Sequence, residues 1–425
     1  MTTPVFKIIP TTQKYDWGKI GLSSKVAQFA VASKIPGFEL DEDAPYAELW
    51  MGTHPSSPAR LTTGETLASH LAQHKELIGE KVVTRFADAG ANEGNLPFLL
   101  KVLAIGKALS IQTHPDKKMA ERLHAEQPKV YKDPNHKPEM ALALTPFTAM
   151  CGFRPLPEIA ATLRNVPELA ALIPKDILDA FLALPPTANS TSPEAKAALK
   201  AVFSAIMTAP PSLFQPKLAD LLDRYACGEV SIEEWPLKEL VVTLNEQFSG
   251  DIGVFCAFVL NYVRMHEGQA IFLAAGEPHA YVSGDIVECM ATSDNVIRAG
   301  LTPKLRDVPN LVAGLTYSAA EPSRHLVQPT PSAFSSSSSH STLYDPPIPE
   351  FSVLRVVLES EAQEVHQPVP GPSVTVVTGG RGAIKWGSEK LEVSKGEVFF
   401  IGADTSVTFA AEGEGLVLYR AYVTA

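Results

Sequence analysis

Cysteine, positive charge and long apolar runs are all scarce in this sequence. The 425 residues include four cysteines, and no two of them form a Cys-x-x-Cys pair, which argues against a thiolate zinc site. The most apolar run, residues 252–263, is too short to cross a bilayer and is interrupted by Asn261. Acidic residues outnumber basic ones by 47 to 36, and the net charge of −11 argues against a nucleic-acid backbone as partner. We therefore expect neither a nucleic-acid nor a membrane partner.

The N-terminus and the cysteines favour a globular cytoplasmic protein. Residues 1–7 do not have the pattern of a signal peptide. Cys256 and Cys289 lie in apolar surroundings and are expected to be reduced and buried. Apolar residues make up 45% of the chain, which favours a substantial core, and the length suits about two or three domains.

A short stretch, residues 109–115, alternates polar and apolar side chains. Alternate residues of a strand share a face, so Ser110, Gln112 and His114 would point the same way. Pro115 lacks a backbone N–H and is expected to end the strand. The side chains of Gln112 and His114 would therefore point into the same cavity wherever this face of the strand lines one.

Two further polar residues stand at the edges of apolar runs. Glu139 opens a second alternating run that reaches Leu144, and His279 follows the apolar run 270–275 after a turn. Together with Gln112 and His114 they offer nitrogen and oxygen ligands without a thiolate, a set that suits a catalytic zinc ion. A hydrogen-bonded polar pair at a strand end is the alternative interpretation.

Charged residues also lie inside runs that are typical of buried strands. Glu48, Lys101 and Glu288 are flanked by apolar residues, and each needs a partner or a polar cavity. For Lys101 three interpretations stay open: structural pairing, a cation facing a substrate, or a proton carrier with a lowered pKa. Trp17 is expected in the core or in the wall of a site.

The pattern of the chain changes several times along its length. Residues 63–86, 116–126 and about 156–246 have helical spacing, and Ser192 followed by Pro193 is typical of a helix start. Strand-like composition returns at 252–262, 269–275 and 286–290, and a loop is expected at 292–304. Residues 329–349 are rich in Ser and Pro, which indicates a mobile loop or linker. From residue 351 onward, short runs separated by turns predict a β-sandwich.

The predicted fold is therefore mainly β with a helical insertion. We expect a cupin- or jelly-roll-like catalytic barrel from residues 1–154 and 250–320, and an α-helical domain from residues 155–249. Residues 321–425 are expected to form a C-terminal jelly-roll-like domain. Its segment 395–401 resembles a cupin strand without the metal-binding histidines, so this degenerate cupin is expected to be metal-free.

Five segments resemble conserved motifs of the type I mannose-6-phosphate isomerases, also called phosphomannose isomerases. They are Tyr15–Gly18, Tyr46–Pro55, Ser110–Lys117, Asn135–Glu139 and Ser293–Lys304. Their order and approximate spacing also match. The resemblance runs from about residue 5 to the C-terminus and is loosest at about 155–245 and after about 310.

The resemblance implies a zinc-dependent aldose–ketose isomerase. One zinc ion per chain would be held by Gln112, His114, Glu139 and His279. Mannose 6-phosphate and fructose 6-phosphate would interconvert through an enediol, feeding mannose activation for GDP-mannose and glycan synthesis. The partner would be a small sugar phosphate, and the chain is expected to act as a monomer.

The resemblance also assigns roles to charged residues around this metal. Arg298 would be the cation beside the developing enediolate, and His136 and Asp294 match residues proposed for opening the sugar ring. The base is left open among Glu288, Lys137, Lys101 and a zinc-bound hydroxide.

A further set is expected to bind the substrate. Ser110, Lys101 and Lys304 are nominated for the phosphate, with Trp17, Glu48 and Tyr281 elsewhere in the site. An iron oxygenase of the cupin type and a sugar-binding protein without turnover are the alternative functions. Glutamine in a ligand position weakens the oxygenase, which prefers two histidines and one carboxylate.

Overall fold

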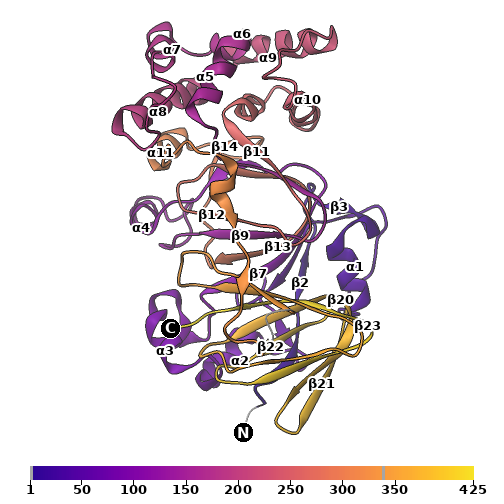
Figure 1. The fold of residues 1–425 in the computed structure, drawn as a ribbon. Coiled ribbons are helices and arrows are strands. Elements are labelled where there is room, and N and C mark those ends of the chain that lie inside the picture. The colour runs from indigo at the N-terminus through magenta and orange to yellow at the C-terminus, as the bar shows by residue number, and fades with distance from the viewer. Residues whose placement is uncertain (1–2, 337–339) are drawn as a thin grey trace.

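The computed structural model describes residues 3–336 and 340–425, which form three parts stacked along one axis (Figure 1). Helices occupy one end, a barrel-like β-sheet lies in the middle, and a second large β-sheet occupies the other end. The expectation of a mainly β fold with a helical insertion is confirmed.

The middle part is an eleven-stranded sheet organised around one long strand, β13 (His279–Ala291). Its other strands are β2 (Thr11–Gln13), β5 (Glu48–Met51), β7 (Phe98–Ile105), β8 (Ile111–Thr113), β9 (Glu139–Ala143), β10 (Phe147–Phe153), β11 (Leu260–Met265), β12 (Ala270–Leu273), β14 (Ile297–Gly300) and β15 (Leu326–Val327). One half of β13 pairs with β7 and β9, and the other half pairs with β8 and β10. At Gly284 of this strand φ is 115° and a Cβ would lie 2.6 Å from the Pro146 carbonyl, so glycine is required.

The strands predicted around the site are confirmed. β8 ends before Pro115, and the helix α4 (Lys117–Glu126) follows with Asp116 as its N-cap. β9 begins at Glu139, and Lys101 lies in the buried strand β7. The predicted helical stretch 63–86 is interrupted: α2 (Leu67–Gln73) and α3 (Glu80–Arg85) are separated at Gly79, where φ is 89°.

The predicted helical insertion is confirmed as a set of helices at one end of the molecule (Figure 1). They are α5 (Leu156–Asn165), α6 (Pro167–Ala170), α7 (Lys175–Leu182), α8 (Pro193–Thr208), α9 (Pro211–Ala226) and α10 (Lys238–Gln247). The side chain of Ser192 accepts a hydrogen bond from the Ala195 amide at 3.2 Å, and Pro193 stands in the first turn, as the sequence predicted. Among the described residues, no single helix is long and apolar enough to span a membrane, although the bent pair α8 and α9 passes on length and composition together.

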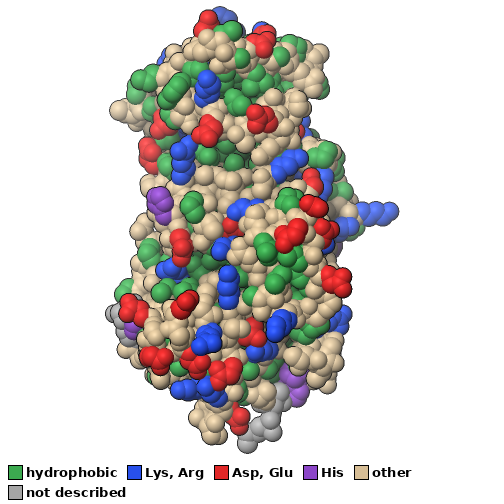
Figure 2. Space-filling model, turned by 90° about the vertical axis from the view of Figure 1, so that its right-hand side faces the viewer, with side chains coloured by type: hydrophobic (Ala, Val, Ile, Leu, Met, Phe, Trp, Pro, Cys, Tyr) green, Lys and Arg blue, Asp and Glu red, His purple; other side chains and the backbone are tan. Residues whose placement is uncertain are grey.

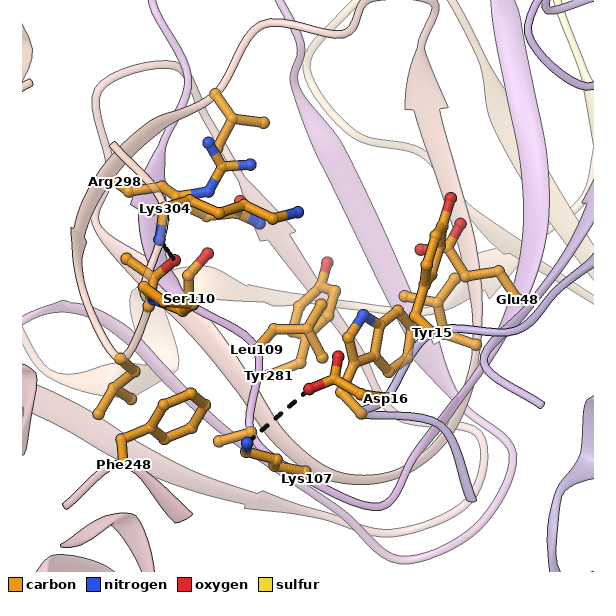
Figure 3. A pocket seen from close by; sticks show the side chains of 18 of the residues that line it. Tyr15, Asp16, Glu48, Lys107, Leu109, Ser110, Phe248, Tyr281, Arg298 and Lys304 are labelled. Carbon is orange, nitrogen blue, oxygen red and sulfur yellow. Dashed lines mark hydrogen bonds and ion pairs between the residues drawn. The ribbon is translucent and has the colours of Figure 1, made fainter. Parts of the chain in front are cut away.

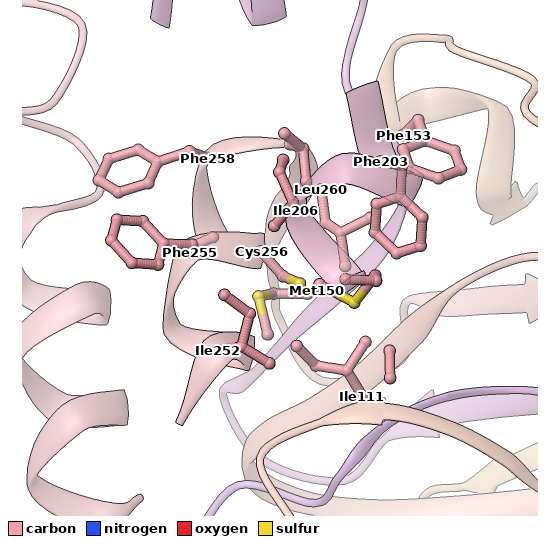
Figure 4. Close-up of a cluster of buried hydrophobic side chains, with 14 of the residues drawn as sticks. Ile111, Met150, Phe153, Phe203, Ile206, Ile252, Phe255, Cys256, Phe258 and Leu260 are labelled. Carbon is pink, nitrogen blue, oxygen red and sulfur yellow. The ribbon is translucent and has the colours of Figure 1, made fainter. Parts of the chain in front are cut away.

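The helices and the barrel share one hydrophobic core (Figure 4). Phe203 and Ile206 of α8 pack in the same cluster as Ile111 of β8 and Met150 of β10. Each fully buried side chain of this size contributes about 1.5–3 kcal/mol. The insertion is therefore part of the core that supports β8, the strand carrying Gln112.

Two predictions between the insertion and the site were wrong. Residues 252–258 form a 3-10 helix, not a strand, and only β11 of that region is extended. All seven residues are buried, and a run that is apolar on every side has no period that separates helix from strand. The loop expected at 292–304 contains β14, which pairs with β8 and places Arg298 on a strand.

The third part is a ten-stranded sheet that includes the first strand of the chain. Its strands are β1 (Val5–Ile9), β6 (Arg60–Leu61), β16 (Thr330–Pro331), β17 (Ser341–Tyr344), β18 (Ser352–Leu358), β19 (Gln363–His366), β20 (Ser373–Trp386), β21 (Glu389–Ser394), β22 (Val398–Ile401) and β23 (Val407–Tyr422). The expectation of a mobile linker at 329–349 was wrong for β16 and β17, because β17 pairs with β18. Residues 337–339 of that segment lie outside the described part of the chain.

Candidate active site

A cavity of about 670 Å³ opens between the barrel and the segment that leaves the helical insertion. Five cations line it: Lys101, Lys107, Lys137, Arg298 and Lys304. Acidic and basic side chains are interspersed over the face of the molecule shown in Figure 2, and the net charge is −11. The cavity is also lined by five acidic residues: Asp16, Glu48, Glu139, Asp251 and Glu288. Lys101, Lys107 and Lys137 pair with carboxylates, whereas Arg298 and Lys304 pair with no carboxylate among the described residues, so these two cations are the ones suited to an anionic ligand.

The cavity gathers most of the residues that the sequence nominated. Its lining includes Trp17, Glu48, Lys101, Ser110, Gln112, Lys137, Glu139, Tyr281, Glu288, Arg298 and Lys304. His114 and His279 contact Glu139 and are each 1% exposed. His136 and Asp294 are not among the lining residues.

Three ligand atoms converge beneath the cavity. The Oε2 atom of Glu139 lies 3.4 Å from the Nε2 atom of His114 and 3.3 Å from the Nε2 atom of His279. All three atoms are buried without a hydrogen-bond partner, and they lie within 4.8 Å of one another. Buried polar atoms are normally paired, so three unpaired atoms at this spacing fit a shared metal ion.

Both imidazoles are held so that Nε2 faces the shared point. His114 donates from Nδ1 to the Asn295 carbonyl at 2.6 Å, and His279 donates from Nδ1 to the Glu277 carbonyl at 3.0 Å. A proton on Nδ1 leaves the lone pair on Nε2, as in metal-binding histidines. Burial lowers the pKa of His114 to about 4, so this ring is neutral near pH 7.

The two oxygen atoms of the Glu139 carboxylate face different groups. Its Oε1 atom pairs with the Lys137 ammonium at 2.6 Å, which leaves Oε2 for the histidines. Burial alone would raise the pKa of Glu139, but Lys137 and His114 outweigh it and hold that pKa well below the usual range. Glu139 is therefore a permanent anion and a suitable metal ligand.

The register of three strands places Gln112 between His279 and Arg298. Gln112 on β8 stands opposite His279 on β13 and opposite Arg298 on β14. Directly opposite residues of antiparallel strands share a face, so these three side chains project together. An amide oxygen completes a nitrogen and oxygen ligand set without a thiolate.

A buried lysine and two glutamates form the wall beside this row. The Nζ atom of Lys101 lies 3.7 Å from Glu48, 3.6 Å from Glu288 and 4.4 Å from the ring centroid of Trp50. Burial favours a lower pKa for Lys101, but the surrounding glutamates outweigh it and raise that pKa above its usual value. The raised pKa argues against Lys101 as a proton carrier with a lowered pKa and favours its role as a cation paired with two glutamates.

The carboxyl group of Glu288 has a raised pKa. Glu288 is 3% exposed, and burial together with the nearby Glu139 raises its pKa to about 7, although Lys101 opposes the shift. A carboxyl group with such a pKa exchanges protons near neutral pH.

Arg298, Lys304 and Ser110 lie together on one side of the cavity, with Tyr15 and Glu48 on the opposite side (Figure 3). Among the described residues, Arg298 has no carboxylate within ion-pair distance, and burial lowers its pKa from the usual value. This side of the cavity therefore presents two cations and a hydroxyl group to a ligand.

The two residues predicted for ring opening are engaged elsewhere. His136 pairs with Glu350 at 2.5 Å, and Asp294 lies 3.3 Å from His54. The Asp294 pKa is lowered mainly by its hydrogen bond with His54. Their catalytic roles stay predictions without support from the lining of the cavity.

Some lining residues were not found from the sequence. Lys107 lies 3.9 Å from Asp16 and 4.5 Å from the ring centroid of Phe248, and Asp251 lines the same cavity. Lys107 directly follows the buried strand β7 and Gly106, a position where a polar residue often reaches a site. Asp251 carried no local signal, because its role depends on contacts with a distant segment.

Comparisons with known proteins agree with this geometry. Residues 5–156 match the catalytic domain of type I phosphomannose isomerase, residues 183–260 its helical insertion domain, and residues 341–389 its C-terminal domain.

Whole-chain relatives give the same answer. The chain is 49% identical to mannose-6-phosphate isomerase of Cryptococcus neoformans, with 100% of each chain covered. It is 44% identical to that of Saccharomyces cerevisiae, covering 100% of this chain and 99% of the relative. A solved structure of zinc-bound mannose 6-phosphate isomerase superposes with a TM-score of 0.79 at 30% identity and 100% coverage of both chains. The chain therefore belongs to the type I phosphomannose isomerase family.

Proposed function

We propose that this protein is a zinc-dependent aldose–ketose isomerase that interconverts mannose 6-phosphate and fructose 6-phosphate. One observation carries the proposal: three unpaired ligand atoms converge beneath a cavity in which two cations, Arg298 and Lys304, pair with no carboxylate among the described residues. The ligand atoms suit a metal, and the cations suit a phosphorylated substrate. The names of the full-length relatives supply the identity of the sugar.

Gln112, His114, Glu139 and His279 would hold the zinc ion. When bound, zinc supplies Lewis acidity that polarises the oxygens at the reacting carbons. Lys137 and the Asn295 carbonyl keep Glu139 and His114 aimed at the shared point. Both contacts fix the orientation of the side chains that would bind the metal.

Glu288 is the base that the geometry favours. It lines the cavity, and its pKa of about 7 allows it to take a proton from C2 of mannose 6-phosphate and return it at C1. Removing that proton forms the enediolate that both sugars share, and the ketose results when C1 takes the proton back and the hydroxyl proton passes from O2 to O1. Lys101 stays protonated 3.6 Å away and stabilises the anionic form of Glu288.

Arg298 stabilises the negative charge that develops on the substrate oxygens. A preorganised guanidinium in a partly desolvated site needs no reorganisation when that charge appears. Ser110 and Lys304, on the same side of the cavity, hold the phosphate. The enzyme works as a cytoplasmic monomer and feeds mannose activation for GDP-mannose and glycan synthesis.

The test is fructose 6-phosphate formation from mannose 6-phosphate, before and after a chelator, and again after zinc is restored. We expect activity to vanish with the chelator and to return with zinc. Exchange of the C2 proton with solvent is followed in the same samples, because a sugar-binding protein without turnover exchanges none. A folded, zinc-loaded sample without either reaction would overturn the proposal.

A further inference from the structure

The segment that leaves the helical insertion forms part of the cavity wall. Phe248, Ser249 and Asp251 follow α10 and line the same cavity as Thr302 and Lys304. The insertion therefore reaches the site through this exit segment, and its last residues face the turn that carries Lys304.

One carboxylate joins the exit segment to that turn. The Oδ1 atom of Asp251 accepts from the Gly253 amide at 2.6 Å and from the Leu301 amide at 2.8 Å. Its Oδ2 atom accepts from the Thr302 amide at 3.2 Å. Hydrogen bonds to an ionised acceptor are stronger than neutral ones, so Asp251 holds two segments that are fifty residues apart in the chain.

The held turn has a backbone that needs such support. Leu301 has a φ of 54°, in the left-handed region that L side chains rarely adopt. The two segments also touch through glycines, since a Cβ on Gly300 would lie 2.6 Å from the Cα atom of Gly253. A conformation of this kind persists only where the surrounding structure fixes it.

Lys304 depends on this turn, whereas Arg298 does not. The Lys304 amide donates to the Thr302 hydroxyl at 3.1 Å, so the lysine follows the residue that Asp251 holds. Arg298 is fixed separately by the pairing of β14 with β8. A change at Asp251 is therefore expected to act on Lys304 more than on Arg298.

We propose that Asp251 is a positioning residue that holds the 301–304 turn and, through it, Lys304 at the phosphate end of the cavity. In this way the helical insertion sets the affinity of the enzyme for the phosphate group of its substrate. The inference rests on the proposed function for its kinetic readout and for the place of Lys304 at the phosphate.

The experiment compares Asp251→Asn, Lys304→Met and the double variant in the zinc-loaded full-length protein. Asparagine keeps the acceptor for Gly253 and Leu301 but presents an amide donor to Thr302. We expect Asp251→Asn to raise KM for mannose 6-phosphate, and the inhibition constant of inorganic phosphate, about tenfold, with kcat within about threefold of wild type. Deuterium exchange at the Leu301 and Thr302 amides should accelerate. Asp179→Asn, which removes an exposed carboxylate from α7, is the matched control and should change none of these values.

The double variant separates positioning from general damage. If Asp251 acts through Lys304, the double variant has the KM of Lys304→Met alone, because coupled residues are not additive. The inference would be overturned if the KM increases of the two single variants multiply in the double variant. It would also be overturned if Asp251→Asn lowers kcat with an unchanged KM, or leaves the amide exchange unchanged. If the wild-type protein lacks isomerase activity, the proposed function fails by itself. Calorimetric binding of inorganic phosphate and the amide exchange then still test Asp251.

Discussion

The two β parts of this molecule arrange their buried polar side chains differently. In the C-terminal sheet, Arg420 contacts His366 at 3.2 Å, His366 contacts Ser341 at 2.9 Å, and Ser341 donates to Glu364 at 2.7 Å. This row runs from a cation to an anion through two neutral groups. In the barrel, three ligand atoms of His114, Glu139 and His279 converge without partners.

The difference shows which kind of burial marks a functional site. Both clusters are almost fully buried, so burial of polar residues does not separate them. What separates them is convergence: among the residues that the structure describes, only the barrel cluster forms a group able to hold a metal ion. The C-terminal row connects its groups in sequence, which suits a structural role.

The largest expected effect is the loss of the metal. His279→Ala removes one of the three converging atoms, and we expect zinc content to fall well below one per chain. Isomerase activity should fall by about three orders of magnitude or more, because the Lewis acid contributes several kcal/mol. Metal analysis and kcat measure the two effects.

His366→Ala is the matched control for that variant. It removes a buried histidine from the other β part, so zinc content and kcat should stay close to wild type. If His279→Ala keeps full zinc content, or His366→Ala loses zinc, the contrast between the two clusters is wrong.

Substituting one arginine in each β part tests the same difference between the two clusters, with smaller expected effects. Arg298→Ala should keep zinc and lower kcat about a hundredfold or more, the effect of one preorganised electrostatic group. Arg420→Met should keep kcat and lower the free energy of unfolding by about 2–3 kcal/mol, because it leaves partners of a fully buried cation unpaired. The free energy of unfolding and kcat are measured for both variants by denaturant unfolding and steady-state kinetics. A near-wild-type kcat in Arg298→Ala would remove it from the mechanism.

The titration of Glu288 is the third expected effect. Its pKa is raised to about 7, so the anionic form that we propose as the base is lost as the pH falls through 7. We expect kcat to fall about tenfold per pH unit on the acid side of 7. Glu288→Gln should be nearly inactive and should lack this acid limb. A wild-type rate that stays flat from pH 8 to pH 5, with zinc bound, would exclude Glu288 as the base.

The sequence was sufficient for features that depend on local pattern. Alternation predicted β8 and β9, and Pro115 marked the end of β8 correctly. The family resemblance then grouped His114, Glu139 and His279, which the structure brings within 4.8 Å. The role of Gln112 as a ligand stays a prediction supported by its register.

Features that depend on distant contacts could not be predicted. β14 was expected to be a loop, because its pairing with β8 joins segments far apart in the chain. The Ser/Pro-rich segment was expected to be a linker, yet Ser341 is buried by its contacts with Glu364 and His366. Composition shows that a segment is polar on average. It does not show which serine is buried by hydrogen bonds to a distant segment.

The last expected effect is the acid sensitivity of the C-terminal row, which is small at each step of pH. Burial, with Arg420 beside it, lowers the pKa of His366 to about 3, whereas an unfolded histidine titrates at about 6.5. Between these values the unfolded chain binds a proton that the folded chain does not, so the free energy of unfolding falls as the pH drops from 6.5 towards 3.

The size of this effect is set by the difference between wild type and a variant. The contribution of His366 is about 1 kcal/mol per pH unit, and His366→Gln should remove it. Denaturant unfolding of both proteins in chelator, at several pH values from 7 to 4, isolates it, because His114 and the other histidines contribute equally to both. Equal slopes would mean that His366 is protonated as readily in the folded chain as in the unfolded one. The C-terminal row would then behave as an open, hydrated cluster, unlike the buried chain of hydrogen bonds that runs from Arg420 to Glu364.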